Sequence, residues 1–144
     1  MEKIIIKQLK KSSPDICNAI RSLTTQLDED YKPLSDDDIK GMINSEGCFI
    51  FAAHSQNKII GMATLIVYRI PYIKKAILED VVVDEKFRGQ GTGTKLIKTA
   101  IAKAKKQGAF SIDLTSRSSR TSANLLYKKL GFKMRETNVY RLEL

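Results

Sequence analysis

The segment from Arg88 to Thr94, Arg-Gly-Gln-Gly-Thr-Gly-Thr, constrains the fold more than any other part of the chain. It follows the apolar, β-branched run 76–83 and precedes a stretch whose apolar residues recur at helical spacing. Glycine at alternate positions in a strand-to-helix turn leaves main-chain N–H groups uncovered by side chains. Together with the positive end of the helix dipole, these amides form an anion site suited to a pyrophosphate.

Three kinds of phosphate-binding loop have glycines at similar spacing, and the sequence excludes two of them. A P-loop needs Ser or Thr directly after its lysine, whereas Leu96 follows Lys95 here. A dinucleotide-binding fingerprint needs glycine where this chain has Thr94, and it belongs beside the first strand rather than past mid-chain. The third pattern, Arg/Gln-x-x-Gly-x-Gly/Ala, is matched by Arg88, Gly91 and Gly93.

The remaining elements follow from hydrophobic periodicity and from capping residues. We expect strands at 2–9, 48–53, 59–68, 76–83, 110–114 and 138–144, with Val81 to Val83 buried on both faces. Helices are expected at 14–27, 36–44, 94–106 and 122–130, the second of them capped by Ser35. No linker or internal repeat interrupts this order. The pattern predicts one α/β (α+β) domain over 1–144, with a mixed, mostly antiparallel central sheet flanked by helices.

The net charge of +9 is unevenly distributed along the chain. Between Lys86 and Arg135 there are thirteen Lys or Arg and one acid, whereas 28–38 holds six acids and one lysine. A uniformly basic chain would suggest nucleic acid, but a polarised one favours two different ligands.

No apolar run approaches the roughly 20 residues of a membrane span, and the N-terminus lacks the features of a signal peptide. We therefore expect a cytoplasmic protein without membrane association. Cys17 and Cys48 form no metal-like or redox pair and are expected to be small buried residues. The single histidine, His54, is expected to be exposed and inert, so no metal site is predicted.

The loop and two further segments resemble the GNAT superfamily of N-acetyltransferases. Leu-Glu-Asp-Val-Val-Val-Asp at 78–84 looks like the family's central strand, and Asn-Leu-Leu-Tyr-Lys-Lys-Leu-Gly-Phe at 124–132 looks like its Leu-Tyr-x-x-x-Gly-Phe signature. The resemblance covers the whole chain and implies the GNAT fold. It also implies acetyl-CoA as co-substrate and direct transfer of its acetyl group, in a ternary complex, to a primary amine of a small molecule or peptide.

A cofactor site made mainly of backbone is implied by the same resemblance. Val81, Val82 and Val83 would lie along the pantetheine and the acetyl group, where an N–H could polarise the thioester carbonyl. Arg88 would add attraction for the pyrophosphate. The amides that would hold the pyrophosphate belong to Gly89, Gln90, Gly91, Thr92, Gly93 and Thr94.

Two residues are implied to carry the proton transfers. Tyr127 is the candidate general acid for the leaving thiolate, and its alternative role is packing against the Gly131-Phe132 corner. Glu79 is the candidate base, and its alternative is a solvated carboxylate at a strand end. The side chain of Asp80 points to the opposite side of a regular strand, although a bulge could reverse it.

One position departs from the family pattern. Many relatives carry Asn seven residues before the tyrosine, where it contacts the cofactor, and this chain has Arg120 there. Arg120 could still reach a cofactor phosphate or the acceptor. Asn124, one turn before Tyr127 on the same helical face, is a second candidate for the cofactor contact.

The sequence says less about the site that binds the acceptor amine. The resemblance places the acidic stretch from Asp28 to Asp38 in a wall of the acceptor cleft, where its six carboxylates would attract a polyamine, an aminoglycoside-like amine or a Lys-rich peptide. The alternative is that Asp36 to Asp38 are ordinary first-turn residues of a helix. Tyr68, Tyr72 and Tyr140 either line the cleft or are half-buried strand aromatics.

Two other function classes compete with the enzyme. One is a catalytically silent acyl-CoA-binding or regulatory domain, and the other, less favoured, is a basic nucleic-acid-binding module, for which no recognisable motif is present. We expect no nucleic-acid partner, and a homodimer is left open.

Overall fold

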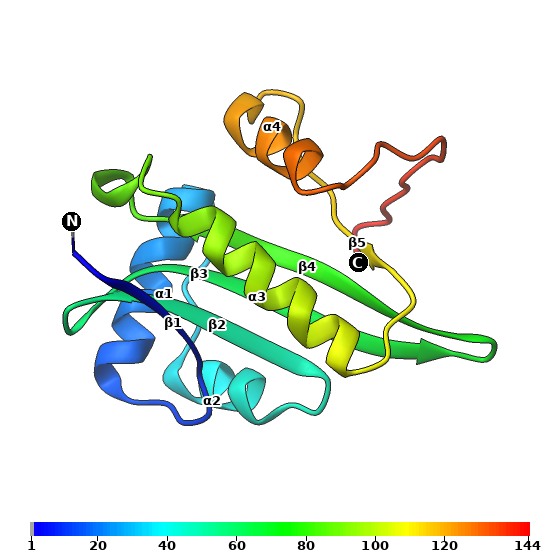
Figure 1. The fold of residues 1–144 in the computed structure, drawn as a ribbon. Helices are drawn as coiled ribbons and strands as arrows, with labels where there is room; N and C mark the ends of the chain where they lie inside the picture. The colour runs from blue at the N-terminus through cyan, green and yellow to red at the C-terminus, as the bar shows by residue number, and fades with distance from the viewer. Residues whose placement is uncertain (1) are drawn as a thin grey trace.

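The computed structural model describes residues 2–144, which form a five-stranded sheet, and Figure 1 shows helices on both faces of this sheet. The strands lie in the spatial order β1 (Ile4–Gln8), β2 (Cys48–Ser55), β3 (Lys58–Ile70), β4 (Ile73–Val83) and β5 (Ile112–Asp113). β1 to β4 pair antiparallel and β5 joins β4 in parallel. The predicted mixed, mostly antiparallel α+β architecture is confirmed.

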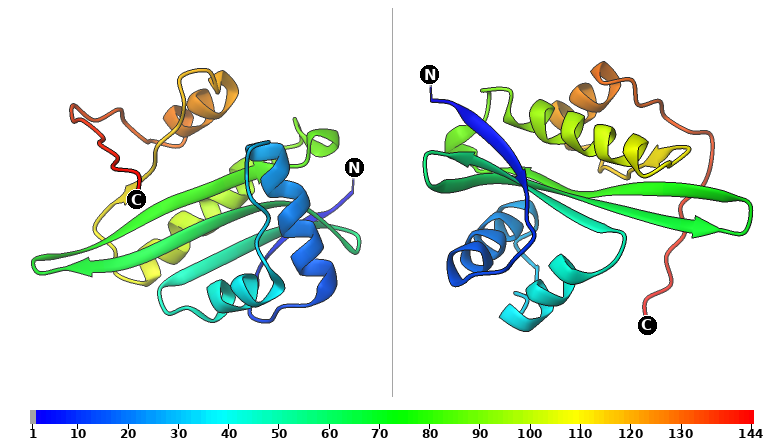
Figure 2. Two further views of the ribbon diagram at one scale, coloured as in Figure 1. Left: turned by 180° about the vertical axis from the view of Figure 1, so that it is seen from behind. Right: turned by 60° about the horizontal axis from the view of Figure 1, so that its bottom comes forward.

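Figure 2 shows α1 (Pro14–Leu27) and α2 (Asp36–Asn44) on one face of the sheet and α3 (Thr92–Lys106) on the other. A 3-10 turn, η1 (Glu85–Phe87), precedes α3, and α4 (Thr121–Lys129) follows β5. The two N-terminal helices have the predicted bounds because their caps are local. Ser13 accepts from the amide of Ile16, while Ser35 and Asp38 form a reciprocal capping box.

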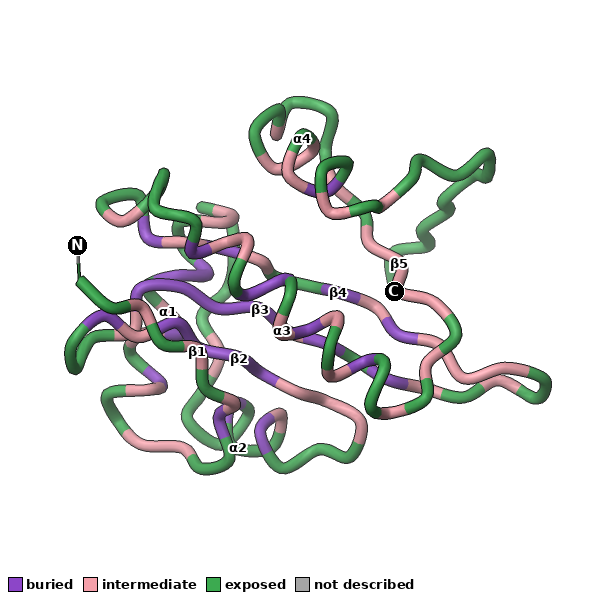
Figure 3. Tube along the Cα trace, in the orientation of Figure 1, coloured by how far each residue is buried: buried purple, intermediate pink, exposed green. Residues whose placement is uncertain are grey.

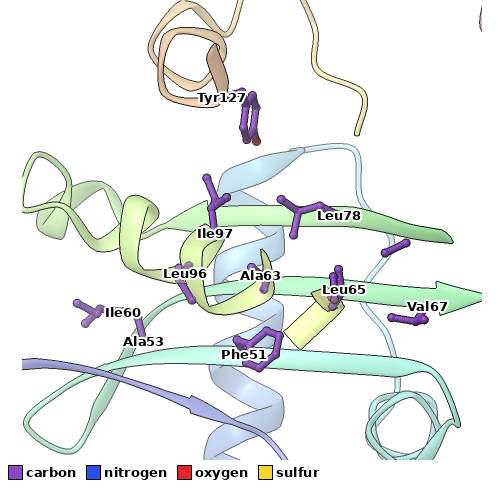
Figure 4. Packing of buried hydrophobic residues seen from close by; sticks show 13 residues of the cluster. Phe51, Ala53, Ile60, Ala63, Leu65, Val67, Leu78, Leu96, Ile97 and Tyr127 are labelled. Carbon is purple, nitrogen blue, oxygen red and sulfur yellow. The ribbon is translucent and has the colours of Figure 1, made fainter. Parts of the chain in front are cut away.

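The sheet separates two apolar clusters, visible as buried stretches in Figure 3. Under α3, Leu96 and Ile97 pack on residues of β2, β3 and β4, including Leu65 and Leu78 (Figure 4). The second cluster lies between the sheet and the two N-terminal helices, and its members include Ile20, Leu23, Ile39, Ile50, Met62 and Val82. Both faces of the central strands are therefore covered, which explains their continuous apolar sequences.

The expected final strand is wrong. The structure has no strand over 138–144, and residues 133–144 are exposed throughout, with Tyr140 87% and Leu142 83% exposed. In Figure 1 this segment leaves α4 and runs outside the sheet. Alternating apolar residues are compatible with a strand, but a strand forms only where a neighbour takes up its N–H and C=O groups. β5, the last strand of the sheet, is two residues long and presents little edge.

Several single-residue expectations also change. Val82 is buried, but Val81 and Val83 are half-buried because they border a cleft. Cys17 is buried as expected, whereas Cys48 is half-buried. His54 is half-buried rather than exposed, because β1 and β3 flank it. Among the helices of residues 2–144, none has both the length and the apolar character needed to cross a membrane.

Candidate functional site

β4 carries a β-bulge in its second half. Met62 pairs with Val82 and Thr64 pairs with Glu79, so two residues of β4 oppose Ala63 alone. Asp80, inside the bulge, has a φ of 51° in the left-handed region.

The bulge shifts the side-chain alternation of β4 by one residue. Leu78 belongs to the cluster under α3, but Val82 belongs to the cluster under α1 and α2, whereas in a regular strand both would share one face. Leu78 points to the α3 side, so its neighbour Glu79 points to the α1 side. Val82 points to the α1 side, so Asp80, two residues before it, points there as well. The reversal that a bulge could produce at Asp80 is therefore present.

β4 separates from β5 soon after they pair. Ala76 pairs with Ile112 and Ile77 with Asp113, and the pairing ends there. Beyond it, Leu78 to Val83 border a cleft of about 1200 Å³ whose opposite wall is α4 and the loop before it. Figure 1 shows α4 standing away from the edge of β4. No strand therefore pairs with the outer side of this half of β4, where the carbonyls of Val83 and Val81 accept hydrogen bonds from the side chains of Arg88 and Arg120.

The glycine loop forms one end of the cleft. Gly89 and Gly91 have φ values of 77° and 79°, which glycine adopts without steric cost. Gly91 is the N-cap of α3 and no side chain caps that helix. Among the described residues, no protein acceptor receives the amides of 89–94. Arg88 fixes the loop, because its Nε donates to the carbonyl of Val83 at 3.0 Å.

Two hydroxyls of the cleft also lack partners. The Oγ atoms of Thr92 and Ser116 are buried without a hydrogen bond, and both residues line the cleft. Thr92 is only 2% exposed. A buried hydroxyl normally has a partner, so the Thr92 hydroxyl and the free amides of its own loop fit a ligand rich in acceptor oxygens, such as a diphosphate.

Tyr127 reaches from α4 toward β4, and Figure 4 shows its ring directed at Leu78 and Ile97. The residue is 7% exposed and lines the cleft. Burial raises the pKa of the phenol, and the guanidinium of Arg120 partly offsets this rise. The hydroxyl is therefore protonated at neutral pH, which is the form that a general acid requires.

The two carboxyls of the bulge have raised pKa values. Burial is the main cause at Glu79, and the adjacent charge of Asp80 adds to it; burial alone raises the pKa of Asp80. Both residues line the cleft. A carboxylate whose pKa is raised is a better proton acceptor near neutral pH than an ordinary one, so this pair can serve as a base.

The wall opposite the bulge comes from the end of α1 and the loop after it, with Thr24, Gln26, Leu27, Asp28 and Tyr31. Of the six acids in 28–38, Asp28 is the one that lines the cleft, and it pairs with Arg117 at 3.8 Å.

The other acids of that stretch point elsewhere. Asp36 pairs with Arg21 at 2.6 Å and Asp38 completes the capping box of α2. Asp36, Asp37 and Asp38 all lie in the first turn of α2, so the alternative of ordinary first-turn residues is the one observed.

The structure brings most of the predicted site residues together. Gln90 is not among the lining residues, and neither is Asn124, whose side chain donates to the carbonyl of Arg117 at 3.0 Å. The predicted residues that line the cleft are Glu79, Val81, Val82, Val83, Arg88, Gly89, Gly91, Thr92, Gly93, Thr94, Arg120 and Tyr127.

Sequence reasoning missed several lining residues and misplaced the aromatic ones. Tyr31 lines the cleft, whereas Tyr68, Tyr72 and Tyr140 do not. Tyr68 is half-buried on β3, and Tyr72 is 83% exposed at the β3–β4 turn. The position of Tyr31 within the acidic stretch was the one available signal. Within residues 2–144, no cluster of three or more His, Cys, Asp or Glu side chains could hold a metal ion.

Comparison with known proteins gives a consistent family. A family model described as "Acetyltransferase (GNAT) family" matches residues 14–132. Human N-acetyltransferase 8 is 28% identical over 96 residues, which are 65% of this chain and 42% of that protein. The chain thus spans less than half the length of this curated relative.

Solved structures agree in fold. An acetyltransferase of Trypanosoma brucei superposes with a TM-score of 0.81 and 27% identity, over 99% of this chain and 100% of that one. An aminoglycoside acetyltransferase from an uncultured soil metagenomic sample, solved with sisomicin, gives a TM-score of 0.85 at 21% identity, over 98% of this chain and 95% of that one. At 21% identity, the similarity to the soil metagenomic enzyme shows the fold alone.

Proposed function

The chain belongs to the GNAT acetyltransferase family, and from this premise we propose that it transfers an acetyl group from acetyl-CoA to a primary amine. The observation that carries the proposal is the row of unpaired amides at 89–94, at the N-terminus of α3 and at the end of an open β4 edge. Such a row suits the diphosphate of a nucleotide-containing cofactor. The open edge beside it suits an extended chain carrying amide groups, such as pantetheine.

Different residues around the cleft would bind different parts of acetyl-CoA, the acetyl donor. The amides of 89–94 and the hydroxyl of Thr92 would bind the diphosphate, and Arg88 would add attraction that salt can screen. The main chain of Val81 to Val83 would align the rest of the donor and place an N–H at the carbonyl that is attacked. Acetyl-CoA supplies an acetyl group activated as a thioester.

Proton transfer is assigned to the side chains on either side of the bulge. Glu79 would accept a proton from the acceptor amine, directly or through water, because its raised pKa makes it basic. Tyr127 would supply a proton to the departing sulfur from the other side of β4. This places the amine on the α1 side of the strand and the donor on the α4 side.

A cationic acceptor agrees with the charges on the α1 side. Glu79, Asp80 and Asp28 line that part of the cleft, and an ammonium group would neutralise them as it enters. The soil metagenomic enzyme, an aminoglycoside acetyltransferase with the same fold, was solved with sisomicin. We therefore favour a small polyamine or an amino sugar over a neutral monoamine.

A thiol-release assay with acetyl-CoA and a panel of amines tests the function. Turnover with at least one amine supports the enzyme. Binding of CoA without turnover would instead favour a silent acyl-CoA-binding domain. Absence of CoA binding together with salt-sensitive DNA binding would favour the nucleic-acid module.

A further inference from the structure

Arg120 is placed unfavourably for the helix that it precedes. It is the N-cap residue of α4, its side chain caps no amide, and the first turn of α4 contains no acid. The N-terminal end of a helix carries partial positive charge, so a guanidinium there opposes the helix dipole. The stability of α4 does not explain this residue, and its side chain instead lines the cleft.

The guanidinium of Arg120 reaches the main chain of β4 just past the bulge, where its Nη2 donates to the carbonyl of Val81 at 3.4 Å. Tyr127 follows seven residues later, two helical turns along the same face. Both side chains line the same cleft, and the positive charge of Arg120 lowers the pKa of the Tyr127 phenol.

Arg120 and Arg88 occupy different parts of the cleft. Arg88 is anchored to the carbonyl of Val83, next to the glycine loop. Arg120 contacts Val81, two residues earlier on β4 and nearer the bulge. The diphosphate end of the cleft therefore already has its cation, and Arg120 belongs to the end where Tyr127 lies.

We propose that Arg120 is a positioning residue for Tyr127: its positive charge stabilises the phenolate that forms when the hydroxyl gives its proton to the departing sulfur. The inference rests on the proposed function. In the step, the N–C bond forms and the C–S bond breaks, and the electron pair of the C–S bond passes to sulfur. Sulfur takes the Tyr127 proton, and the phenolate regains the proton that the amine loses, through water or Glu79.

The physical reason is the cost of a charge in a buried position. Tyr127 is almost fully buried, so its phenolate would be poorly solvated without a nearby cation. Among the described residues, Arg120 is the charged group that acts on this phenol. The other charged side chains around the cleft are Asp28, Glu79, Asp80, Arg88, Arg117 and Arg141.

The first test is the ionisation of Tyr127 itself, which needs no turnover. The protein is labelled with meta-fluorotyrosine, whose phenol ionises at lower pH, and each of its five tyrosines is followed by fluorine NMR. Tyr127→Phe identifies the signal. Arg120→Gln should move this titration to higher pH, and Arg120→Lys should restore part of the shift.

Arg117→Gln is the matched control, because it removes a cation from the same loop that pairs with Asp28 rather than with the phenol. It should leave the Tyr127 titration where it is. An unchanged titration in folded Arg120→Gln, or an equal shift in both glutamine variants, overturns the proposal.

The second test separates catalysis from binding. Arg120→Gln should lower kcat severalfold, because a phenol with a higher pKa is a weaker general acid, while calorimetry finds its affinity for CoA unchanged. Loss of CoA affinity with kcat unchanged would assign Arg120 to cofactor binding and overturn the proposal. If wild-type protein turns over no amine but the ionisation shift is present, the Arg120–Tyr127 pairing stands and the proposed function falls.

Discussion

Phe132 packs edge-on against Tyr127, with the ring centroids 5.9 Å apart and the planes at 68°. The amide of Phe132 also donates to the carbonyl of Tyr127 at 3.0 Å, at the turn that ends α4. The ring of Tyr127 is thus held by packing, and its hydroxyl is the part left for chemistry. The packing role and the acid role considered from the sequence are compatible in one residue.

Removing only the hydroxyl should therefore separate these roles. We expect Tyr127→Phe to lower the rate of CoA release about 100-fold, because the ring stays packed while the proton donor is lost. Thermal unfolding and the calorimetric affinity for CoA should stay near the wild-type values. Equal losses of turnover and of CoA affinity would assign Tyr127 to packing alone.

The pH dependence of the rate should report on Glu79. A base works only when deprotonated, so activity is lost as the pH falls through the pKa of this carboxyl. Because burial and Asp80 raise that pKa, the loss should begin above the ordinary glutamate value of 4.5. Glu79→Gln should remove this limb and lower the remaining rate. A limb that persists in Glu79→Gln would assign the titration to another group, such as Asp80.

Asp80 should reduce stability at neutral pH. Its pKa is raised in the folded state, so folding favours the protonated form, and stability falls as the pH rises from the ordinary value of 3.8 through the folded value. Asp80→Asn keeps the shape, tolerates a positive φ and removes the charge. Its Tm should slightly exceed that of wild type at neutral pH, because Asp80 is exposed and solvent screens most of its charge, and the difference should shrink as the pH approaches 3.8. A lower Tm at neutral pH would contradict the account.

The exposed C-terminal segment should contribute little to stability. Tyr140 and Leu142 bury almost no surface, so Tyr140→Ser and Leu142→Ser should each change the free energy of unfolding by less than about 0.5 kcal/mol. Denaturant unfolding measures this directly. A loss of several times that size would mean that the segment pairs with an apolar surface in solution.

The features predicted best from the sequence are those that neighbouring residues determine, such as helix starts and the glycine loop. The helix starts at Pro14 and Asp36 follow from Ser13 and Ser35 through caps that span three residues. The glycine loop was recognised because its spacing is local as well. The strand expected at 138–144 depends on a distant edge that alternation alone does not reveal.

The directions of the side chains in the cleft could not be predicted from the sequence either. That Glu79 and Asp80 share a face follows from the pairing of β3 with β4, and Asp80 could be placed only by allowing for a bulge. The contact of Arg120 with Val81 depends on how α4 stands relative to β4, across 39 residues of chain. Such contacts come from tertiary packing, which periodicity does not encode.

Calorimetric titration of CoA tests most directly whether the amides at 89–94 bind its diphosphate. Wild-type protein should bind CoA, and Gly91→Leu, which places a side chain at the cleft, should bind at least about tenfold more weakly. Gly108→Leu is the control, because Gly108 has nearly the same φ and equally open surroundings but lies outside the cleft, so it carries the same strain. The account predicts normal binding by Gly108→Leu and weak binding by Gly91→Leu. Folded wild-type protein that binds no CoA, or Gly91→Leu that binds it as tightly as wild type, would contradict it.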